Sequence, residues 1–557
     1  MWPSHVMPSI AWMREYRSPW LRPDLTAGLT AATIVIPKAM AYATIAGLPL
    51  QVGLYTAIVP MLVYALFGAS RVLSVSTTTT IAILTAAELG RVAPGGDASM
   101  LLTAAATLAV LTGAILLVAY LLRLGFVANF ISEPVLTGFK SGIGLVIVVD
   151  QLPKLFGIHI EKTGFFRDIA AIVQALPSTS IPTFTLAALL LVLIFGLERF
   201  VPKSPVPLIA IALAILASAL GLRDMNVAIV GSVPSDLPSF VPPDLGLFAE
   251  MWPAAAGIAL MSFTETIAAA RAFAARGEPR PEPNQELFAI GLANVAGGLT
   301  GAMPAGGGTS QTALNRRVGA VTQVAALVTA GTAVATLLFL APLIALMPHA
   351  ALAAVVIAYS LELIKPAEFR TIRRVRRIEF RWALIAFAGV VFLGTLQGIL
   401  VAVVASLFSL AQQAYNPPVY VMGRKRGTSV FRRVSPDRPD DELWPGLLIL
   451  RIEGRLFFAN AQQVIEAMRS FIAQAKPRVV VLDCSSVIDI EFTAVRLLAE
   501  TEQALRNEGI ALWLAALNPS TLEVVRRSKL GEALGRERTF FNLDTAVARF
   551  TSERMST

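Results

Sequence analysis

Cysteine, histidine and charge are all scarce in this sequence of 557 residues. The one cysteine, Cys484, excludes an intrachain disulfide and argues against a metal site built on cysteines. The three histidines show no ligand spacing among themselves, so the sequence indicates no metal and no other cofactor. Charged residues make up 15% of the chain and hydrophobic residues 55%, a balance typical of a protein that lies mostly in lipid.

Motifs of catalysis are absent as well. The polar stretches contain no HExxH, GxSxG, Walker A or CxxC pattern, so no acid, base or nucleophile is brought together by sequence spacing. We therefore expect a protein that is not an enzyme. The first residues also lack an apolar core followed by a small-residue cleavage site, and we expect the first membrane helix to direct insertion itself.

Apolar runs fill the chain up to about residue 415. A helix needs about 20 apolar residues to cross the hydrocarbon layer. Segment 74–80 opens a helix with polar residues, and 306–315 is too short and polar to span alone. Counting 306–318 as a half-span and dividing the last stretch near Gly394 or Gly398 gives about fourteen helices. The other candidates are 26–47, 51–68, 73–90, 101–123, 126–150, 182–200, 205–222, 251–274, 286–303, 318–347, 349–364 and 380–415.

Arginine and lysine gather in every second connection between these spans. One set of connections holds Arg123, Arg316 and Arg317 and the arginine run at 370–381, whereas the opposite turns, 47–51 among them, are nearly free of both. Because cytoplasmic loops are enriched in these residues, we expect both termini in the cytoplasm and the protein in the cell inner membrane. The arginine run fits a contact with anionic membrane lipids better than a nucleic-acid patch, so no nucleic acid is expected as a partner.

The chain becomes ordinary in composition after the last span. Residues 416–445 are rich in Pro, Arg and Asp and are interpreted as a solvated linker with one short strand at 419–422. Three apolar runs, LLILRIEG, RVVVLDCS and IALWLAAL, predict strands, and 461–475 and 493–507 have helical periodicity. We therefore predict a cytoplasmic N-terminal segment at 1–22, a transmembrane domain at 23–415, the linker, and a small α/β domain at 446–557.

Several stretches resemble one known family in the right order. The chain is similar to the sulfate permease family at LQVGLYTAIVPMLVYALFGASR (50–71), ISEPVLTGFKSG (131–142), FTETIAAARAFA (263–274) and ELFAIGLANVAGGLTGAMPAGGGTSQTALN (286–315). Its last part, VVVLDCSSVIDIEFTAVRLL (479–498), resembles the central motif of the STAS domain. The combination covers nearly the whole chain and is far more specific than any single motif.

The resemblance implies an α-helical polytopic membrane protein with a seven-plus-seven inverted repeat, sorted into a core and a gate domain, and a cytoplasmic STAS domain. Short helices three and ten would meet head to head at the substrate site. Two helix N-termini aimed at one cavity form a natural anion site. The candidate binding residues there are Ser76, Thr77 and Thr78 on one side and Thr309, Ser310 and Gln311 on the other. Taken alone, these stretches are better explained as flexible turns whose hydroxyls bond to their own helices, and only their place in the family pattern favours a binding site.

Lys38 and Glu265 are expected near the midplane, where ionisable groups are costly and mark function. The family often has arginine at the position of Gln311, so we predict that Lys38 restores the missing positive charge. Glu265 would pair with Lys38 or take a proton during transport, and a purely structural pair is the alternative. Glu133 and Lys140, two helical turns apart, are interpreted as structural residues at the cytoplasmic edge.

Thr493 lies at the position that is phosphorylated in STAS domains of anti-sigma antagonists. The neighbouring Phe492 and Ala494 depart from that pattern, and an ordinary helix N-cap is favoured over a regulatory phosphosite. The resemblance implies that the domain supports dimerisation, trafficking or regulation, with a homodimer and a cytoplasmic partner as expected assemblies.

These observations predict a secondary active transporter of small anions. Sulfate is the first choice, and bicarbonate, chloride and dicarboxylates remain open. Proton symport through Glu265 is preferred, sodium symport and anion exchange stay open, and the resemblance implies an elevator-like motion. A membrane anion sensor that signals through the STAS domain and a nucleobase-type carrier are the alternatives.

Overall fold

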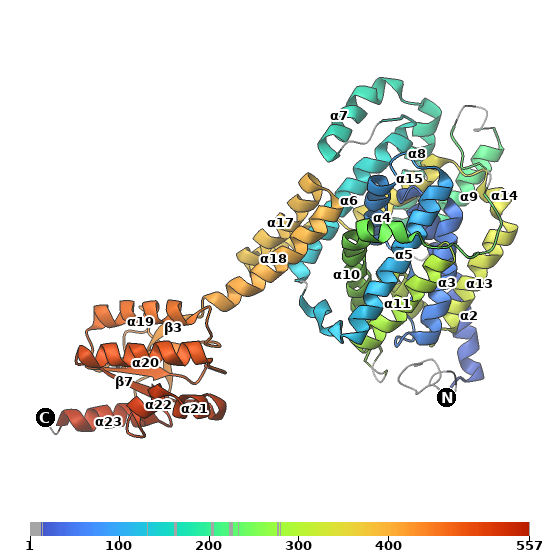
Figure 1. The fold of residues 1–557 in the computed structure, drawn as a ribbon. Coiled ribbons are helices and arrows are strands. Elements are labelled where there is room, and N and C mark those ends of the chain that lie inside the picture. Colours follow the sequence, from blue (N-terminus) through green and yellow to red (C-terminus); the bar gives the residue numbers. More distant parts are fainter. Residues whose placement is uncertain are drawn as a thin grey trace. The chain divides into compact units, whose positions relative to one another are not determined.

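Helices dominate the N-terminal part of the chain, and a sheet covered by helices forms the C-terminal part (Figure 1). The computed structural model describes Met13 and residues 15–130, 132–160, 164–201, 205–221, 225, 227–231, 233–275, 278 and 280–555. The chain divides into two units, Met1–Leu407 and Phe408–Thr557. Most of the N-terminal segment predicted at 1–22 lies outside the described residues.

The helices of the first unit follow the predicted order of spans. Its first half contains α2 (Ser18–Ile45), α3 (Leu50–Phe67), α4 (Thr79–Val92), α5 (Ala98–Leu121), η1 (Leu124–Phe130), α6 (Glu133–Phe156), α7 (Phe165–Ala175), η2 (Leu176–Ser178), α8 (Ile181–Phe200) and α9 (Val206–Ala219). The second half contains η4 (Leu245–Leu247), α10 (Phe248–Ala272), α11 (Pro283–Leu299), α12 (Thr309–Val318), α13 (Val324–Phe339), α14 (Ala341–Ile344), α15 (His349–Leu361), α16 (Pro366–Val375), α17 (Arg377–Leu393) and α18 (Thr395–Tyr415). Seven of the described helices are long and apolar enough to cross a membrane, and three shorter ones are apolar.

Helices α2 and α6 are among those that start several residues away from the predicted positions. Helix α2 begins at Ser18 rather than at residue 26, and α6 begins at Glu133 rather than at 126. Both have a proline among their first two residues, where the missing N–H would have no partner in the helix anyway. Helices α7 and α16, both strongly amphipathic, were not predicted.

The membrane helices pack as two groups. We call α2, α3, α4, α5, α10, α11, α12 and α13 the core group, and α6, α8, α9, α15, α16, α17 and α18 the gate group, because the helices of each pack mainly on one another. Each half of the unit contributes its first helices to the core group and its last helices to the gate group. This division follows the inverted repeat that the resemblance implied. Contacts between the groups are made mainly by α2 with α15 and α9.

Two very short strands join the half-helices α4 and α12. Strand β1 (Val75–Ser76) pairs antiparallel with β2 (Gly306–Gly307). A side chain on either glycine would collide with α10, because a Cβ on Gly306 would lie 3.2 Å from the Ser262 Cα and one on Gly307 would lie 2.7 Å from the Thr266 Cα. Glycine therefore lets the strand pair lie directly against α10, and both half-helices start from this one point.

The second unit contains a six-stranded sheet in the order β4-β3-β5-β6-β7-β8. Strands β5 to β8 are parallel, and β3 is antiparallel to both of its neighbours. The strands are β3 (Val419–Arg424), β4 (Phe431–Arg433), β5 (Leu447–Ile452), β6 (Val479–Asp483), β7 (Ala511–Ala515) and β8 (Thr539–Phe540). Strands β3 and β4 thus lie within 416–445, where the sequence predicts a linker with one short strand.

Helices cover both faces of this sheet, because successive side chains of a strand point to opposite faces and both faces carry apolar side chains. Leu450, Leu482 and Leu514 point to one face and pack with residues of α19, α20, α21 and α22. Val481 and Trp513 point to the other face and pack with α23. The helices are α19 (Ala461–Ala475), α20 (Phe492–Asn507), α21 (Pro519–Arg526), α22 (Lys529–Leu534) and α23 (Leu543–Met555).

Candidate anion site

A cavity of about 400 Å³ lies between the core and gate groups at the start of α4 and α12. Core residues on its wall come from α2, α4, α10 and α12, and gate residues come from α6, α15 and the start of α16. The predicted residues Lys38, Thr77, Thr78, Thr309, Ser310, Gln311 and Glu265 all line it. Ser76 lies in β1 and contacts the cavity wall through Gln311.

The two half-helices present their N-terminal ends to this cavity. Helix α4 is capped by the Thr78 hydroxyl, which accepts a bond from the Ile81 N–H at 3.4 Å. Helix α12 follows Gly308 and has no side-chain cap, so its first N–H groups keep their capacity for a ligand. Among the described residues, the buried Thr77 hydroxyl has no hydrogen-bond partner. Donors and the positive ends of two helix dipoles therefore converge on one space, as an anion requires.

Gln311 is held by the strand that precedes α4. Its side-chain oxygen accepts bonds from the hydroxyls of Ser74 at 3.2 Å and Ser76 at 3.0 Å. A Cβ on Gly308 would lie 2.6 Å from the same oxygen, so glycine is needed for this packing. Gln311 and Ser76 thus fix the two half-helices to each other.

Lys38 brings a positive charge to the cavity, and its direct contacts are with neutral groups, while the carboxylates of Glu362 and Glu198 act on it from farther away. Its ammonium donates to the Ser310 hydroxyl at 2.9 Å and lies over the Tyr359 ring, 3.7 Å from the ring centre. The side chain is only 3% exposed, and Pro37 lies directly before it in α2. Because a hydroxyl and an aromatic ring do not cancel the charge, the ammonium retains attraction for an anion.

Glu265 does not pair with Lys38 as predicted, and its cationic partner is Lys140 of α6. The Lys140 ammonium lies 3.1 Å from Glu265 Oε1, while the hydroxyls of Thr78 and Thr80 donate to the two carboxylate oxygens at 2.7 and 3.1 Å. The long lysine stem lets Lys140 reach from the gate group to α10 of the core group, next to the contact of α4 with α6. Glu133 lines the cavity too, so both residues that the sequence placed at the cytoplasmic edge lie on the cavity wall.

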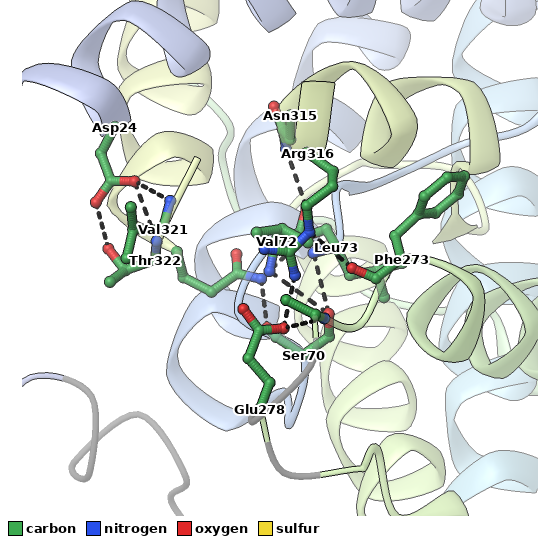
Figure 2. Close-up of polar contacts among 12 residues, drawn as sticks. Asp24, Ser70, Val72, Leu73, Phe273, Glu278, Asn315, Arg316, Val321 and Thr322 are labelled. Carbon is green, nitrogen blue, oxygen red and sulfur yellow. Dashed lines mark hydrogen bonds and ion pairs between the residues drawn. The ribbon is translucent and has the colours of Figure 1, made fainter. Parts of the chain in front are cut away.

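The far end of α12 is anchored by a separate polar network (Figure 2). The Asn315 amide donates to the Val72 carbonyl at 3.1 Å, and Arg316 donates to the Phe273 carbonyl at 2.7 Å and pairs with Glu278 at 2.6 Å. These contacts hold α12 against the segment that leads into β1 and against the end of α10.

Nearby, Asp24 of α2 accepts bonds from the N–H groups of Val321 and Thr322 and from the Thr322 hydroxyl (Figure 2). The carboxylate is fully buried. It thus joins the first helix of one half to the segment between α12 and α13.

Sequence reasoning missed four tyrosine or glutamate residues at the site, Tyr42, Tyr359, Glu362 and Glu368. Tyr42 accepts a bond from the Thr79 hydroxyl at 2.9 Å and stands four residues after Lys38, on the same helix face, which the spacing could have indicated. Tyr359 and Glu362 reach the cavity from α15 and its end, and no local pattern marks them.

A second cavity of about 840 Å³ lies toward the opposite end of α4. Ile45, Leu89, Arg91 and Asp150 are on its wall, together with residues 390–395 at the end of α17. Like the first cavity, it is lined by both helix groups. The half-helix α4 therefore has a space at each of its ends, with Ile81, Ala82 and Leu84 buried between them.

In the second unit, Thr493 and Cys484 lie in different environments. Glu491, in an extended conformation, is the N-cap of α20, and Thr493 is the second residue of the helix, so the N-cap interpretation of Thr493 was wrong. Thr493 is partly exposed. Cys484 is buried, and burial raises the pKa of its thiol to about 12. In the described part of the chain, no cluster of three or more His, Cys, Asp or Glu residues could hold a metal ion.

Comparison with solved structures identifies the same fold. A murine anion transporter of Solute Carrier family 26, solved in the inward-facing state, gives a TM-score of 0.89 at 23% identity, covering 98% of this chain and 94% of its own. The transmembrane domain of a cyanobacterium bicarbonate transporter gives 0.60 at 22% identity, covering 70% of this chain and 98% of its own. The predicted fold class, a helical polytopic membrane protein with a small α/β domain, is confirmed.

Sequence comparison shows the family. The model of the sulfate permease family matches residues 21–386, and that of the STAS domain matches 438–546. A probable sulfate transporter of Mycobacterium tuberculosis is 38% identical over 549 residues, which cover 98% of each chain. Sulfate transporter 4.1 of Arabidopsis thaliana is 30% identical over 569 residues, covering 98% of this chain and 82% of its own. The protein is therefore a multi-pass membrane protein that belongs to the sulfate permease family and carries a STAS domain.

Proposed function

We propose that the protein is a secondary active transporter that carries small anions through the space between its core and gate groups. The observation that supports this most directly is the Lys38 ammonium, which contacts neutral groups and faces the starts of two half-helices. Thr77, Thr78 and Thr309 would complete the hydrogen bonds of the bound anion. The relatives that are named transporters favour the same class of activity.

Sulfate is the proposed substrate, with bicarbonate and dicarboxylates as the next choices. The cavity of about 400 Å³ is large enough for each of them. Relatives that cover nearly the whole chain are named sulfate transporters, whereas the bicarbonate transporter matches in fold alone. A neutral nucleobase would gain little from the buried charge of Lys38, which weighs against a nucleobase-type carrier.

Proton symport is the proposed form of coupling, and it uses the bridge between Glu265 and Lys140. When Glu265 takes a proton, the bridge loses its negative partner and the Lys140 ammonium becomes available to the anion. The same bridge joins α10 of the core group to α6 of the gate group. An elevator-like movement of one group against the other would have to break it, so proton uptake would favour both anion binding and movement.

The proposed orientation places both termini and the cavity around Lys38 on the cytoplasmic side of the cell inner membrane. The arginine-rich segment 370–381 follows directly after the part of α15 that lines this cavity, which supports the assignment. We further propose that the protein works as a homodimer. A cytoplasmic partner of the STAS domain and phosphorylation of Thr493 stay predictions.

Uptake of labelled sulfate, bicarbonate and fumarate into proteoliposomes tests this function, with proton and sodium gradients imposed separately. We expect uptake of one anion to follow the proton gradient and the Glu265→Gln variant to lose that dependence. Glu466→Gln, the same change at an exposed position of α19, is the control and should behave like the wild type.

Two results would contradict the proposal. Sodium-driven uptake that Glu265→Gln leaves unchanged would refute proton coupling while leaving anion transport in place. Saturable sulfate binding without flux under any gradient would instead favour the sensor that signals through the STAS domain.

A further inference from the structure

Four arginines surround a small cavity where α16 meets α17. Arg370, Arg373 and Arg374 stand three and four positions apart on one face of α16, and Arg377 is the first residue of α17. The backbone is extended at Arg376, between the two helices, which lets both contribute. The four side chains alone line a cavity of about 390 Å³, and all four are exposed.

The acidic residues nearest in sequence are engaged elsewhere. Glu368 lies 2.8 Å from the Lys365 ammonium and accepts a bond from the Thr137 hydroxyl, and Glu379 lies 3.2 Å from Arg376. Residues 370–381 contain six arginines and one glutamate. Like charges this close repel one another. A bound anion would relieve the repulsion, and guanidinium groups match the oxygens of a phosphate in pairs.

The face of α16 opposite these arginines carries apolar residues and Glu368, and the helix packs on α17 and α6. No residue of α16 is buried, and Val375 is 72% exposed. At the edge of this face, Phe369 makes edge-to-face contacts with Phe380 and Phe387 of α17. A short helix with arginines on one face and exposed apolar groups on the other is suited to the surface of a bilayer.

We propose that this arginine cluster is a binding site for the phosphate group of anionic phospholipids in the leaflet next to α16. The lipid's phosphodiester would occupy the space between the four guanidinium groups, and the exposed Val375 would contact the acyl chains. Because Glu368 of the same helix lines the anion cavity, a lipid bound here would fix this part of the gate group at the membrane surface. Anionic lipid should therefore support transport as well as binding.

Binding of short-chain lipids to the purified full-length protein in neutral detergent tests the site. The probes are phosphatidylglycerol, phosphatidylcholine and inorganic phosphate, with affinities measured by thermophoresis. We expect saturable binding of phosphatidylglycerol alone. The triple variant with Arg370, Arg374 and Arg377 changed to Gln should bind it at least about tenfold more weakly, since each arginine adds attraction to an anionic lipid.

A matched triple variant controls for the loss of charge. Arg469, Arg526 and Arg536 are exposed arginines of the second unit, and their change to Gln should leave lipid affinity within about twofold of the wild type. Saturable sulfate binding by both variants checks that they are folded. Equal phosphatidylglycerol affinity of the two triple variants would overturn the proposal, and binding of inorganic phosphate as tight as that of the lipid would overturn the assignment to lipid.

Discussion

Replacing Lys38 by glutamine removes the positive charge of the anion cavity and keeps a hydrogen-bond donor of similar reach. In the wild type, the ammonium is 2.9 Å from the Ser310 hydroxyl and 3.7 Å from the centre of the Tyr359 ring. Glutamine can still bond to Ser310, but it has no charge to offer to an anion. The variant therefore isolates the electrostatic contribution of this residue from its packing.

The expected loss follows from the strength of hydrogen bonds to charged groups. Such a bond contributes about 1.5–3 kcal/mol in a protein, and about 1.4 kcal/mol corresponds to a factor of ten in affinity. Anion binding by Lys38→Gln should thus be about 10- to 150-fold weaker than that of the wild type. Unfolding temperature should not fall, because burying an ammonium at 3% exposure itself costs free energy.

Sulfate binding and sulfate uptake in proteoliposomes, measured on the same preparation, check this prediction. Lys154→Gln is the matched control, since Lys154 lies in the last turn of α6 and is not on the wall of the Lys38 cavity. Its affinity should equal that of the wild type. Wild-type affinity and rate in Lys38→Gln would refute the idea that Lys38 replaces the arginine common in the family at position 311.

Three further substitutions or treatments test the packing of the chain. Gly138→Ala should destabilise the protein by about 1–3 kcal/mol, because the added Cβ would lie 2.0 Å from the Ala383 carbonyl oxygen. Gly196→Ala is the control, since no atom lies within 4 Å of its added Cβ, and it should not destabilise the protein. Equal thermal stability of the two variants would contradict the close contact of α6 with α17. Asp24→Ala leaves two N–H groups without their acceptor and should cost at least about 2 kcal/mol of unfolding free energy, so an unchanged unfolding transition would show that the carboxylate is not needed. Burial raises the pKa of the Cys484 thiol to about 12. Maleimide at neutral pH should therefore label the denatured chain and leave the folded chain unlabelled. Rapid labelling of the folded protein would be inconsistent with that burial.

Much of the fold could be predicted because lipid acts on each segment separately. Most predicted spans coincide with helices to within a few residues, and 461–475 is a helix over that same range. The early start of α2 was not predicted, and Asp24 lies in the part of the helix that was missed. Its carboxylate is satisfied by the N–H groups of residues 321 and 322, which no pattern near Asp24 indicates.

The residues predicted for the candidate site lie together, but their contacts differ from the predicted ones. Lys38, Thr78 and Ser310 line one cavity, in keeping with the place that the family resemblance gave them. The partner of Glu265 was assigned to Lys38 from similar depth in the membrane. Depth gives the position of a side chain along the membrane normal and leaves its direction around the helix undetermined, so Lys140 of α6 was overlooked.

The sequence by itself determined which segments are helices or strands and where polar groups interrupt them, because hydropathy and periodicity are local properties of the chain. Only the tertiary structure decided that Lys38 meets Ser310, 272 residues away, and that Lys140 crosses between the helix groups to Glu265. Those contacts depend on how each helix is rotated and packed against its neighbours. Packing of that kind is a property of the whole bundle, which no single stretch of sequence specifies.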